Sequence, residues 1–324
     1  MALQHIVFDI IITILILASA LPAAFLFWKI KLKKGIFYKY KTVNSILACL
    51  MLSGSIIIFY GSYIEPRIII KKQKEIDLPG IEQSIRIALI ADMQLGPYKR
   101  EKFMNRIVEK IDAEKPDLVF IAGDLIDNTG GGLPELEFLN PIQKLSGRTP
   151  VYAVNGNHEY GLFTANDIDK PRTSLDLSKK TETKMESLGV RYLANELETI
   201  TVNSESFYLF GGDEFWTRKL DLSPLDRRFD SSKPTIALLH NPAATWDLAG
   251  HDIDLALMGH THGGQIRLPF IGPLGRADHV IPSKWYKGWY TFEGLKVFVT
   301  SGVGESGARA RLFNPPEIVY LTIK

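Results

Sequence analysis

Side chains that can bind metal ions stand at the ends of successive apolar runs in this sequence. The six of them are Asp92, Asp124, Asn157, His240, His260 and His262. Carboxylate, amide and imidazole groups without a thiolate suit Mn, Fe, Zn, Co or Mg. If the apolar runs are strands of an open α/β sheet, ligands bind beyond the carboxyl ends of those strands. The pattern therefore predicts a metal site assembled from five separate segments.

This set of ligands indicates a particular chemistry. A carboxylate can bridge two cations about 3.5–4 Å apart, which is the spacing that two-metal hydrolases use. Water between two cations loses a proton easily, and the hydroxide can attack phosphorus in line. His260 and His262 are two residues apart, so in extended backbone they point the same way and can reach different metals. Each of these short segments alone would more often be a turn or a surface loop. Their joint occurrence at the ends of successive apolar runs favours the metal site.

The elements that must position these groups alternate at first between strands and helices. Apolar runs at 85–90, 117–122 and 151–154 predict strands, and the spacing of apolar residues over 99–115 predicts a helix. A second candidate helix covers 133–145. Later strands are expected at 190–193, 199–202, 206–210, 235–239, 255–258, 295–300 and 317–323. Early βαβ units followed by many strands predict an α/β fold of packed sheets with helices outside.

Four motifs, in this order, resemble the calcineurin-like metallophosphoesterase superfamily: GDLID at 123–127, GNHE at 156–159, LLHNP at 238–242 and GHTHGGQ at 259–265. A fifth motif, normally Asp-x-His, reads Asp92-Met93-Gln94. The extended GHTHGGQIRLP and the closing RLFNPPE resemble a bacterial branch that includes membrane-associated phosphodiesterases and a UDP-2,3-diacylglucosamine hydrolase. The resemblance covers residues 85–324 and implies a four-layer α/β/β/α sandwich.

The resemblance also implies a centre of two divalent metal ions, drawn from Mn, Fe, Zn, Co and Mg. Asp124 would bridge both ions. The other ligands would be Asp92, Gln94 and His262 for the first metal, and Asn157, His240 and His260 for the second. His158 would be the catalytic histidine, which protonates the leaving group or stabilises charge on phosphorus, and Asp127 would orient its neighbours.

Three arginines are candidates for contact with a substrate phosphate, because guanidinium groups bind phosphate through two hydrogen bonds. They are Arg267, Arg309 and Arg311. Ordinary surface pairing is the alternative for all three.

Gln94 departs from the pattern of the superfamily, because glutamine offers a neutral carbonyl oxygen in place of a basic nitrogen. Three interpretations stay open. The first metal site favours Mn or Mg, or it holds its metal weakly, or the protein has lost turnover. Every other ligand type is present, together with His158, which favours an active enzyme.

The N-terminal part of the chain contains two long runs without a charge. Residues 10–28 and 42–64 contain 19 and 23 uncharged residues. Each run is long enough to cross a hydrocarbon core of roughly 30 Å as a helix. A pair of buried core helices is the alternative. We therefore expect a membrane anchor over 1–64 with two transmembrane helices, a polar linker over 65–84, and a phosphoesterase domain over 85–324.

The charges around these two runs predict an orientation in the membrane. Six lysines lie between the runs: Lys29, Lys31, Lys33, Lys34, Lys39 and Lys41. Four cations follow the second run: Arg67, Lys71, Lys72 and Lys74. Because cytoplasmic loops carry the excess of Lys and Arg, the lysine loop should be cytoplasmic and both chain ends outside. The expectation is a multi-pass protein of the cell membrane with an extracytoplasmic catalytic domain.

The leading functional hypothesis is a metal-dependent hydrolase of a phosphodiester, pyrophosphate or phosphomonoester, acting on a phosphate-containing small molecule or lipid. The competing hypothesis is a membrane-anchored binding or sensor protein that keeps the fold without efficient turnover. The net charge of +2 over 324 residues gives no reason to expect a nucleic-acid partner. The single cysteine, Cys49, excludes an internal disulfide and a thiolate metal site.

Overall fold

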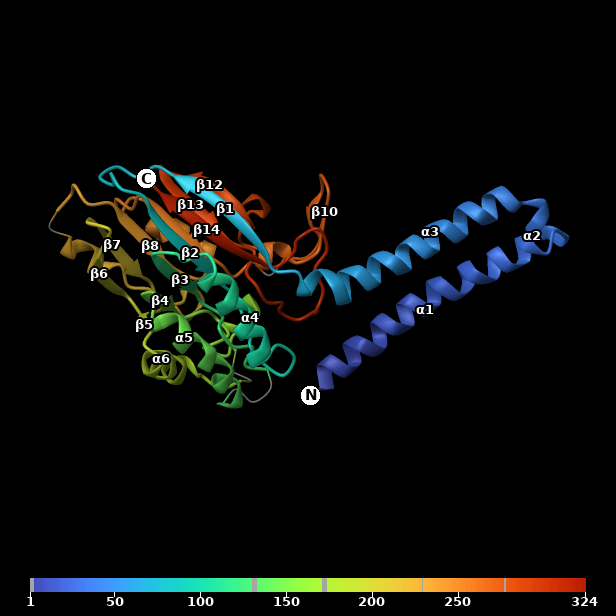
Figure 1. Ribbon diagram of the computed structural model, residues 1–324, viewed down its shortest axis with the longest axis horizontal. Coiled ribbons are helices and arrows are strands. Elements are labelled where there is room, and N and C mark those ends of the chain that lie inside the picture. The colour runs from blue at the N-terminus through green and yellow to red at the C-terminus, as the bar shows by residue number, and fades with distance from the viewer. Residues whose placement is uncertain (1–2, 130–132, 171–173, 229, 277) are drawn as a thin grey trace.

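The computed structural model describes residues 3–129, 133–170, 174–228, 230–276 and 278–324. Two long helices, α1 (Leu3–Lys31) and α3 (Lys41–Phe59), run side by side and project from a globular body (Figure 1). The short helix α2 (Gly35–Lys39) lies at the far end of this helical hairpin, and the N-terminal end of α1 lies back beside the body. The expected run 10–28 lies within α1, and the expected run 42–64 begins in α3 and ends five residues after it.

The hairpin is held together by small side chains. Ala23 and Ala48 are fully buried between α1 and α3, and the hydroxyl oxygens of Ser19 and Ser55 lie 2.6 Å apart. Small residues and interhelical hydroxyl bonds let helices approach closely in lipid. By length and composition alone, the helical segments Ile6–Lys31 and Lys41–Arg67 are able to cross a membrane. The second of them continues past α3 through η1 (Tyr60–Ile64) and η2 (Glu65–Arg67).

Strands of the described residues form two six-stranded sheets. The first has the order β1-β14-β2-β3-β4-β5 and is parallel except between β14 and β2. Its strands are β1 (Ile70–Ile76), β2 (Ile85–Ile90), β3 (Leu118–Ala122), β4 (Val151–Val154), β5 (Arg191–Leu193) and β14 (Glu317–Ile323).

The second sheet has the order β12-β13-β9-β8-β7-β6, with four parallel central strands and an antiparallel hairpin at each edge. Its strands are β6 (Glu196–Val202), β7 (Glu205–Gly211), β8 (Thr235–Leu238), β9 (Leu255–Met258), β12 (Gly288–Phe292) and β13 (Leu295–Val299). A separate two-stranded ribbon joins β10 (Arg267–Leu268) to β11 (Gly272–Pro273).

The core lies between the two sheets and under the helices of the first sheet. Leu89 and Phe120 from the first sheet pack with Leu209, Leu238 and Phe298 from the second. The outer face of the first sheet is covered by α4 (Glu101–Asp112), η3 (Leu133–Ile142), α5 (Gln143–Ser146) and α6 (Ser178–Ser187). The predicted α/β fold of packed sheets is confirmed.

Three expectations need correction or refinement. The predicted helix over 133–145 is a 3-10 helix followed by α5, because Pro141 has no N–H to donate in a regular α-helix. The predicted linker over 65–84 contains β1, whose backbone pairs with the edge strand β14. On the outer face of the second sheet, the expected helical layer is reduced to short segments: η6 (Ser223–Arg227), η7 (Pro242–Ala244) and α7 (Thr245–Leu248). The remaining short helices are η4 (Ala165–Asp167), η5 (Phe215–Thr217), η8 (His262–Gly264) and η9 (Ser283–Trp285).

Candidate metal centre and its pocket

The loops that carry the candidate ligands turn sharply at the carboxyl ends of the strands. Asp92 and Asp124 follow β2 and β3 with φ angles of 54°, and His260 follows β9 with a φ of 69°. Left-handed backbone is uncommon for residues other than glycine and is concentrated at functional sites. These turns direct the three side chains into the space between the two sheet ends, where all three are buried.

Glu159 links two of these loops through hydrogen bonds. Its buried carboxylate accepts hydrogen bonds from the backbone N–H groups of Asp124 (3.1 Å), Leu125 (2.8 Å), Ile126 (3.2 Å) and Gly156 (2.7 Å). Glu159 ends the GNHE motif but was not predicted to have a role. Bonds from several N–H groups to one ionised acceptor are strong, so Glu159 fixes the backbone that presents Asp124.

Only glycine fits at position 156. A Cβ atom there would lie 2.2 Å from the Asp124 Oδ1 atom and 2.4 Å from its backbone nitrogen. The glycine therefore allows the loop after β4 to pass directly over the Asp124 carboxylate, and this close passage brings Asn157 to the site.

We define the second ligand set as Asp124, Asn157, His240 and His260. The polar side-chain atoms of these residues lie close together. The Asn157 Oδ1 atom lies 2.8 Å from His260 Nδ1 and 3.0 Å from His240 Nε2. His240 Nε2 lies 3.3 Å from both His260 Nδ1 and Asp124 Oδ1. Neighbouring ligands of one tetrahedral metal with bonds of 2.0–2.1 Å lie about 3.3–3.4 Å apart. Two of these contacts have that spacing, the two from Asn157 are shorter, and the four side chains are all of types that bind metal ions.

Backbone carbonyls orient two of these ligands. The Nδ1 atom of His240 lies 2.7 Å from the Ala122 carbonyl, so donation there directs Nε2 toward the site. The Asn157 amide donates to the Leu162 carbonyl at 2.6 Å, which turns its oxygen toward the two histidines. Partners of this kind fix the tautomer and the ring or amide orientation of metal ligands.

The first ligand set, which we define as Asp92, Gln94, Asp124 and His262, lies beside the second. One ligand atom from each of Asp92, Asp124 and His262 lies within 4.8 Å of the other two, and the three side chains can hold a metal ion. Burial lowers the pKa of His262 to about 3, so its imidazole is neutral and keeps a lone pair for a metal. Asp124 belongs to both sets, as a bridging carboxylate requires.

Gln94 enters the first ligand set through its amide. Its Nε2 atom donates to the Asp124 Oδ2 atom at 2.7 Å, and its buried Oε1 atom has no hydrogen-bond partner among the described residues. An unpartnered buried carbonyl costs free energy unless a donor or a cation satisfies it. The geometry is therefore compatible with Gln94 as an oxygen ligand.

The charges at the centre fit a divalent cation. Burial raises the pKa of Asp92 to about 7, and its Oδ2 atom has no hydrogen-bond partner in the described chain. Burial would also raise the pKa of Asp124, but the nearby His240 and His158 outweigh it and hold that pKa low. Burial would lower the pKa of His240, but the charge of Asp124 raises it to about 10. Two buried carboxylates thus favour a positive charge between them, which a metal ion would supply.

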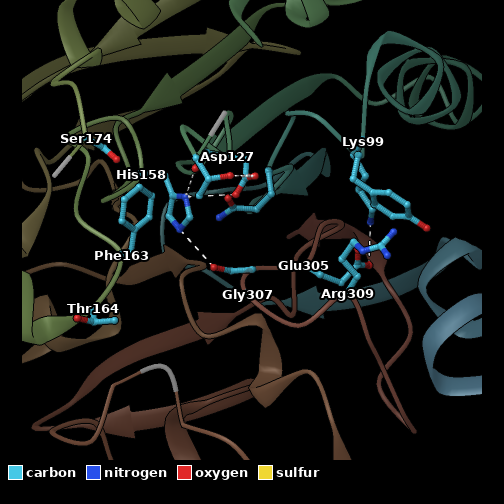
Figure 2. A pocket seen from close by; sticks show the side chains of 13 residues that line it. Lys99, Asp127, His158, Phe163, Thr164, Ser174, Glu305, Gly307 and Arg309 are labelled. Atoms are coloured by element: carbon cyan, nitrogen blue, oxygen red, sulfur yellow. Dashed lines mark hydrogen bonds and ion pairs between the residues drawn. The ribbon is translucent and has the colours of Figure 1, made fainter. Parts of the chain in front are cut away.

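His158 lies at the border between the metal centre and open space. Its Nδ1 atom lies 2.7 Å from the Asp127 carbonyl oxygen, while Nε2 lies 3.9 Å from Asp124 Oδ2 and 3.4 Å from the Ser306 hydroxyl (Figure 2). Donation from Nδ1 to the carbonyl leaves Nε2 facing the pocket. The ring is buried against Phe163, at 4.9 Å between ring centroids, which restricts its rotation.

A pocket of about 450 Å³ opens beside His158. Its walls are formed by Gln94, Tyr98, Lys99, Asp127, Thr129, His158, Phe163, Thr164, Ser174, Glu305, Ser306, Gly307 and Arg309 (Figure 2). Lys99 was not predicted as a site residue, because a single lysine at the start of a predicted helix carries no signal of its own. Lys99 pairs with Glu305 at 2.8 Å, and burial lowers the pKa of this lysine to about 8.

The structure separates the three candidate arginines. Arg309 lines the pocket, where its guanidinium stacks on the Tyr98 ring at 4.0 Å and pairs with Asp9 of α1 at 2.5 Å. Arg311 is fully buried and donates to backbone carbonyls that include those of Ser301, Gly304 and Asn314. Arg267 donates to the Gly263 carbonyl at 2.7 Å. Arg309 is therefore the one of the three that lies on the pocket wall.

The fold and the cluster of buried carboxylates and histidines are typical of a calcineurin-like phosphoesterase domain. The chain belongs to the calcineurin-like phosphoesterase family, whose model matches residues 85–264. The predicted family is confirmed.

Several curated proteins are similar over most of this chain. An uncharacterized metallophosphoesterase of Helicobacter pylori is 32% identical over 82% of this chain and 66% of its own length. A bovine transmembrane protein with metallophosphoesterase domain is 30% identical over 76% of this chain and 54% of its own length. Phosphodiesterase YaeI of Escherichia coli is 25% identical over 74% of this chain and 82% of its own length. The chain therefore spans just under two thirds of the Helicobacter pylori protein. The bovine relative and the two apolar helices together indicate membrane association.

Proposed function

We propose that this protein hydrolyses a phosphate ester or anhydride of an amphiphilic molecule at the membrane surface, with two divalent metal ions as cofactors. The proposal rests on one pocket, whose wall includes residues of the candidate metal centre and a residue paired with the membrane hairpin. The pocket that contains His158 and Gln94 also contains Arg309, and Arg309 is paired with Asp9 of the membrane hairpin. The same pocket thus joins the hydrolytic centre to the apolar helices.

The residues of this chain would divide the reaction between them. We assign the first metal to the first ligand set and the second metal to the second ligand set, with Asp124 shared. Bound metals in such a centre polarise the phosphate and lower the pKa of water. With both ring nitrogens protonated, His158 would keep its Nδ1–H on the Asp127 carbonyl and donate the Nε2 proton, or a hydrogen bond from it, to the leaving-group oxygen. Lys99 and Arg309 would balance the negative charge of the phosphate at the pocket wall.

A second hollow supports an anionic, amphiphilic substrate. It measures about 520 Å³ and adjoins the pocket through Tyr98 and Lys99. Its lining includes four cations without an ion pair to any described residue: Arg67, Arg100, Lys102 and Arg106. Glu101 also lines it, and Phe103 and Phe138 add apolar side chains. Because Arg67 ends the second apolar helical segment, this hollow lies where a lipid headgroup would meet the helix.

A substrate panel tests this function. The full chain in detergent would be stripped of metal, reloaded with Mn, and assayed with bis-p-nitrophenyl phosphate, p-nitrophenyl phosphate and a phospholipid in mixed micelles. Hydrolysis that depends on added metal is the expected result, and faster hydrolysis of the phospholipid would support the amphiphilic substrate. Metal binding without turnover on every substrate would instead favour the binding or sensor protein with the same fold.

We also propose an orientation, with a membrane anchor over 1–64 and the catalytic body outside the cytoplasm. Both ends of the hairpin that meet the body lie on one side, and the lysine-rich turn around α2 lies at the other (Figure 1). Loops rich in lysine stay cytoplasmic. A reporter enzyme that works only outside the cytoplasm should therefore be active when it is fused after Lys324, and a cytoplasmic reporter at the same position should be inactive. Protection of the body from protease added to intact spheroplasts would contradict this orientation.

Gln94 offers a prediction about metal preference. Changing Gln94 to His should tighten binding of Zn or Co at the first ligand set, because imidazole suits these metals better than a carbonyl oxygen. Changing Gln94 to Ala should weaken that site and leave the second ligand set intact. Calorimetric titration of metal into the stripped protein would show two classes of site that separate in the alanine variant. The matched control is a change of the exposed Gln143 to His. Identical titrations for the unchanged protein and for both Gln94 variants would mean that Gln94 is not a ligand.

A further inference from the structure

The turn between β10 and β11 exposes large apolar side chains that the fold does not use. Cross-strand pairs of Arg267 with Pro273 and Leu268 with Gly272 place Phe270 and Ile271 at its tip. Phe270 is 109% exposed and Ile271 is 71% exposed, and neither belongs to a core cluster of the described residues. Two neighbouring large apolar side chains that are this exposed to water indicate that they contact an apolar phase outside the fold.

The backbone holds this tip in a defined shape. Phe270 has a φ of 66° and Gly272 a φ of 91°, so the chain reverses through left-handed conformations within three residues. Leu274, which follows the ribbon, donates its N–H to the Ile266 carbonyl at 2.9 Å and leaves its side chain 58% exposed. The tip is therefore a paired ribbon that presents apolar side chains.

Hydrogen bonds tie the base of this ribbon to the membrane hairpin. The Arg267 N–H donates to the Leu312 carbonyl at 2.9 Å, and the neighbouring Arg311 N–H donates to the Gly61 carbonyl at 2.8 Å. Gly61 lies in η1, within the second apolar helical segment. In Figure 1 the ribbon stands beside the place where α3 meets the body, on the side from which the hairpin projects. Phe313, which is 56% exposed, belongs to the same junction.

We propose that Phe270 and Ile271 insert into the lipid bilayer beside the hairpin and form a second attachment of the catalytic body to the membrane. The inference rests on the two apolar helices lying in a bilayer, and it adds a contact that those helices do not make. Aromatic and aliphatic side chains at a loop tip are stabilised at the boundary between headgroups and acyl chains. A body held at two places keeps a fixed tilt, so the pocket wall at Arg309 stays at a constant distance from the lipid surface.

Depth-dependent fluorescence quenching tests the insertion. The full chain would carry Cys49→Ser and Phe270→Cys, with the new cysteine labelled by an environment-sensitive fluorophore, in vesicles of phosphatidylcholine and phosphatidylglycerol. Lipids with a spin label near the headgroup should quench this fluorophore about threefold more than one at Lys180→Cys on the exposed face of α6, because only the tip would reach the bilayer. Ile271→Cys provides a second label at the tip, in case the first variant alters the turn.

Three results would overturn the proposal. Equal quenching at the tip and at Lys180→Cys would remove the second attachment, and strong quenching of a label on the native Cys49 of α3 by lipids spin-labelled deep in the acyl chain would show the anchor still in place. Absence of acyl-chain quenching at Cys49 as well would show that the hairpin itself is not in lipid, and the tip would then have no bilayer to enter. Efficient bis-maleimide cross-linking between two Phe270→Cys chains in place of lipid quenching would assign the tip to a second copy of the protein, and would also overturn it.

Discussion

Replacing Asp124 with alanine is expected to remove bound metal and abolish hydrolysis together. The carboxylate belongs to both ligand sets, and it also accepts hydrogen bonds from the His158 N–H (3.0 Å) and from Gln94 (2.7 Å). Loss of a residue that only supports a ligand costs about 10–100-fold in metal affinity, so loss of the shared ligand should cost more than about 100-fold. Metal analysis of the purified variant and hydrolysis of bis-p-nitrophenyl phosphate would measure the two effects.

The control for this change is Asp112→Ala. Asp112 pairs with Arg148 at 2.8 Å on the exposed surface of α4, so its loss should leave metal content and hydrolysis unchanged. Thermal unfolding of both variants would separate loss of metal from loss of fold. An Asp124→Ala protein that keeps its full metal content would show that this carboxylate does not bridge the two sites.

Changing His158 to alanine should lower turnover by about 10²–10⁴-fold, which is the usual contribution of a general acid. Metal content should hardly change, because His158 Nε2 lies 3.9 Å from the nearest Asp124 oxygen and outside the close spacing of the second ligand set. The loss should appear in kcat more than in KM, since the proton or hydrogen bond is needed as the leaving group departs.

The exposed His279 supplies the matched control, and His279→Ala should retain turnover. Full activity of His158→Ala would mean that another group assists the leaving oxygen. Loss of metal in the same variant would mean that His158 belongs to the ligand sets.

The sequence by itself predicted the elements and the family. A short apolar run predicted the strand 85–90, since a strand covered on both faces is apolar nearly throughout. Helical spacing predicted the helix that is α4, since burial of one face imposes that period. The order of four motifs predicted the calcineurin-like family, which the match over 85–264 confirms. The assignment of each ligand to one of two metals stays a prediction. No pattern in the sequence indicated that Glu159 would bind four backbone N–H groups, because that contact depends on how two loops cross.

Local sequence determined that this chain would contain two long apolar helices and a row of metal-binding side chains at strand ends. These features follow from residue type and spacing along a single segment. Tertiary structure decided the features that join distant segments. It buried Arg311 under backbone carbonyls and left Arg309 on the pocket wall, it paired Arg309 with Asp9 about three hundred residues earlier, and it set the Phe270 tip beside the hairpin. Such placements depend on the packing of two sheets against each other, and a spacing pattern along the chain does not contain that information.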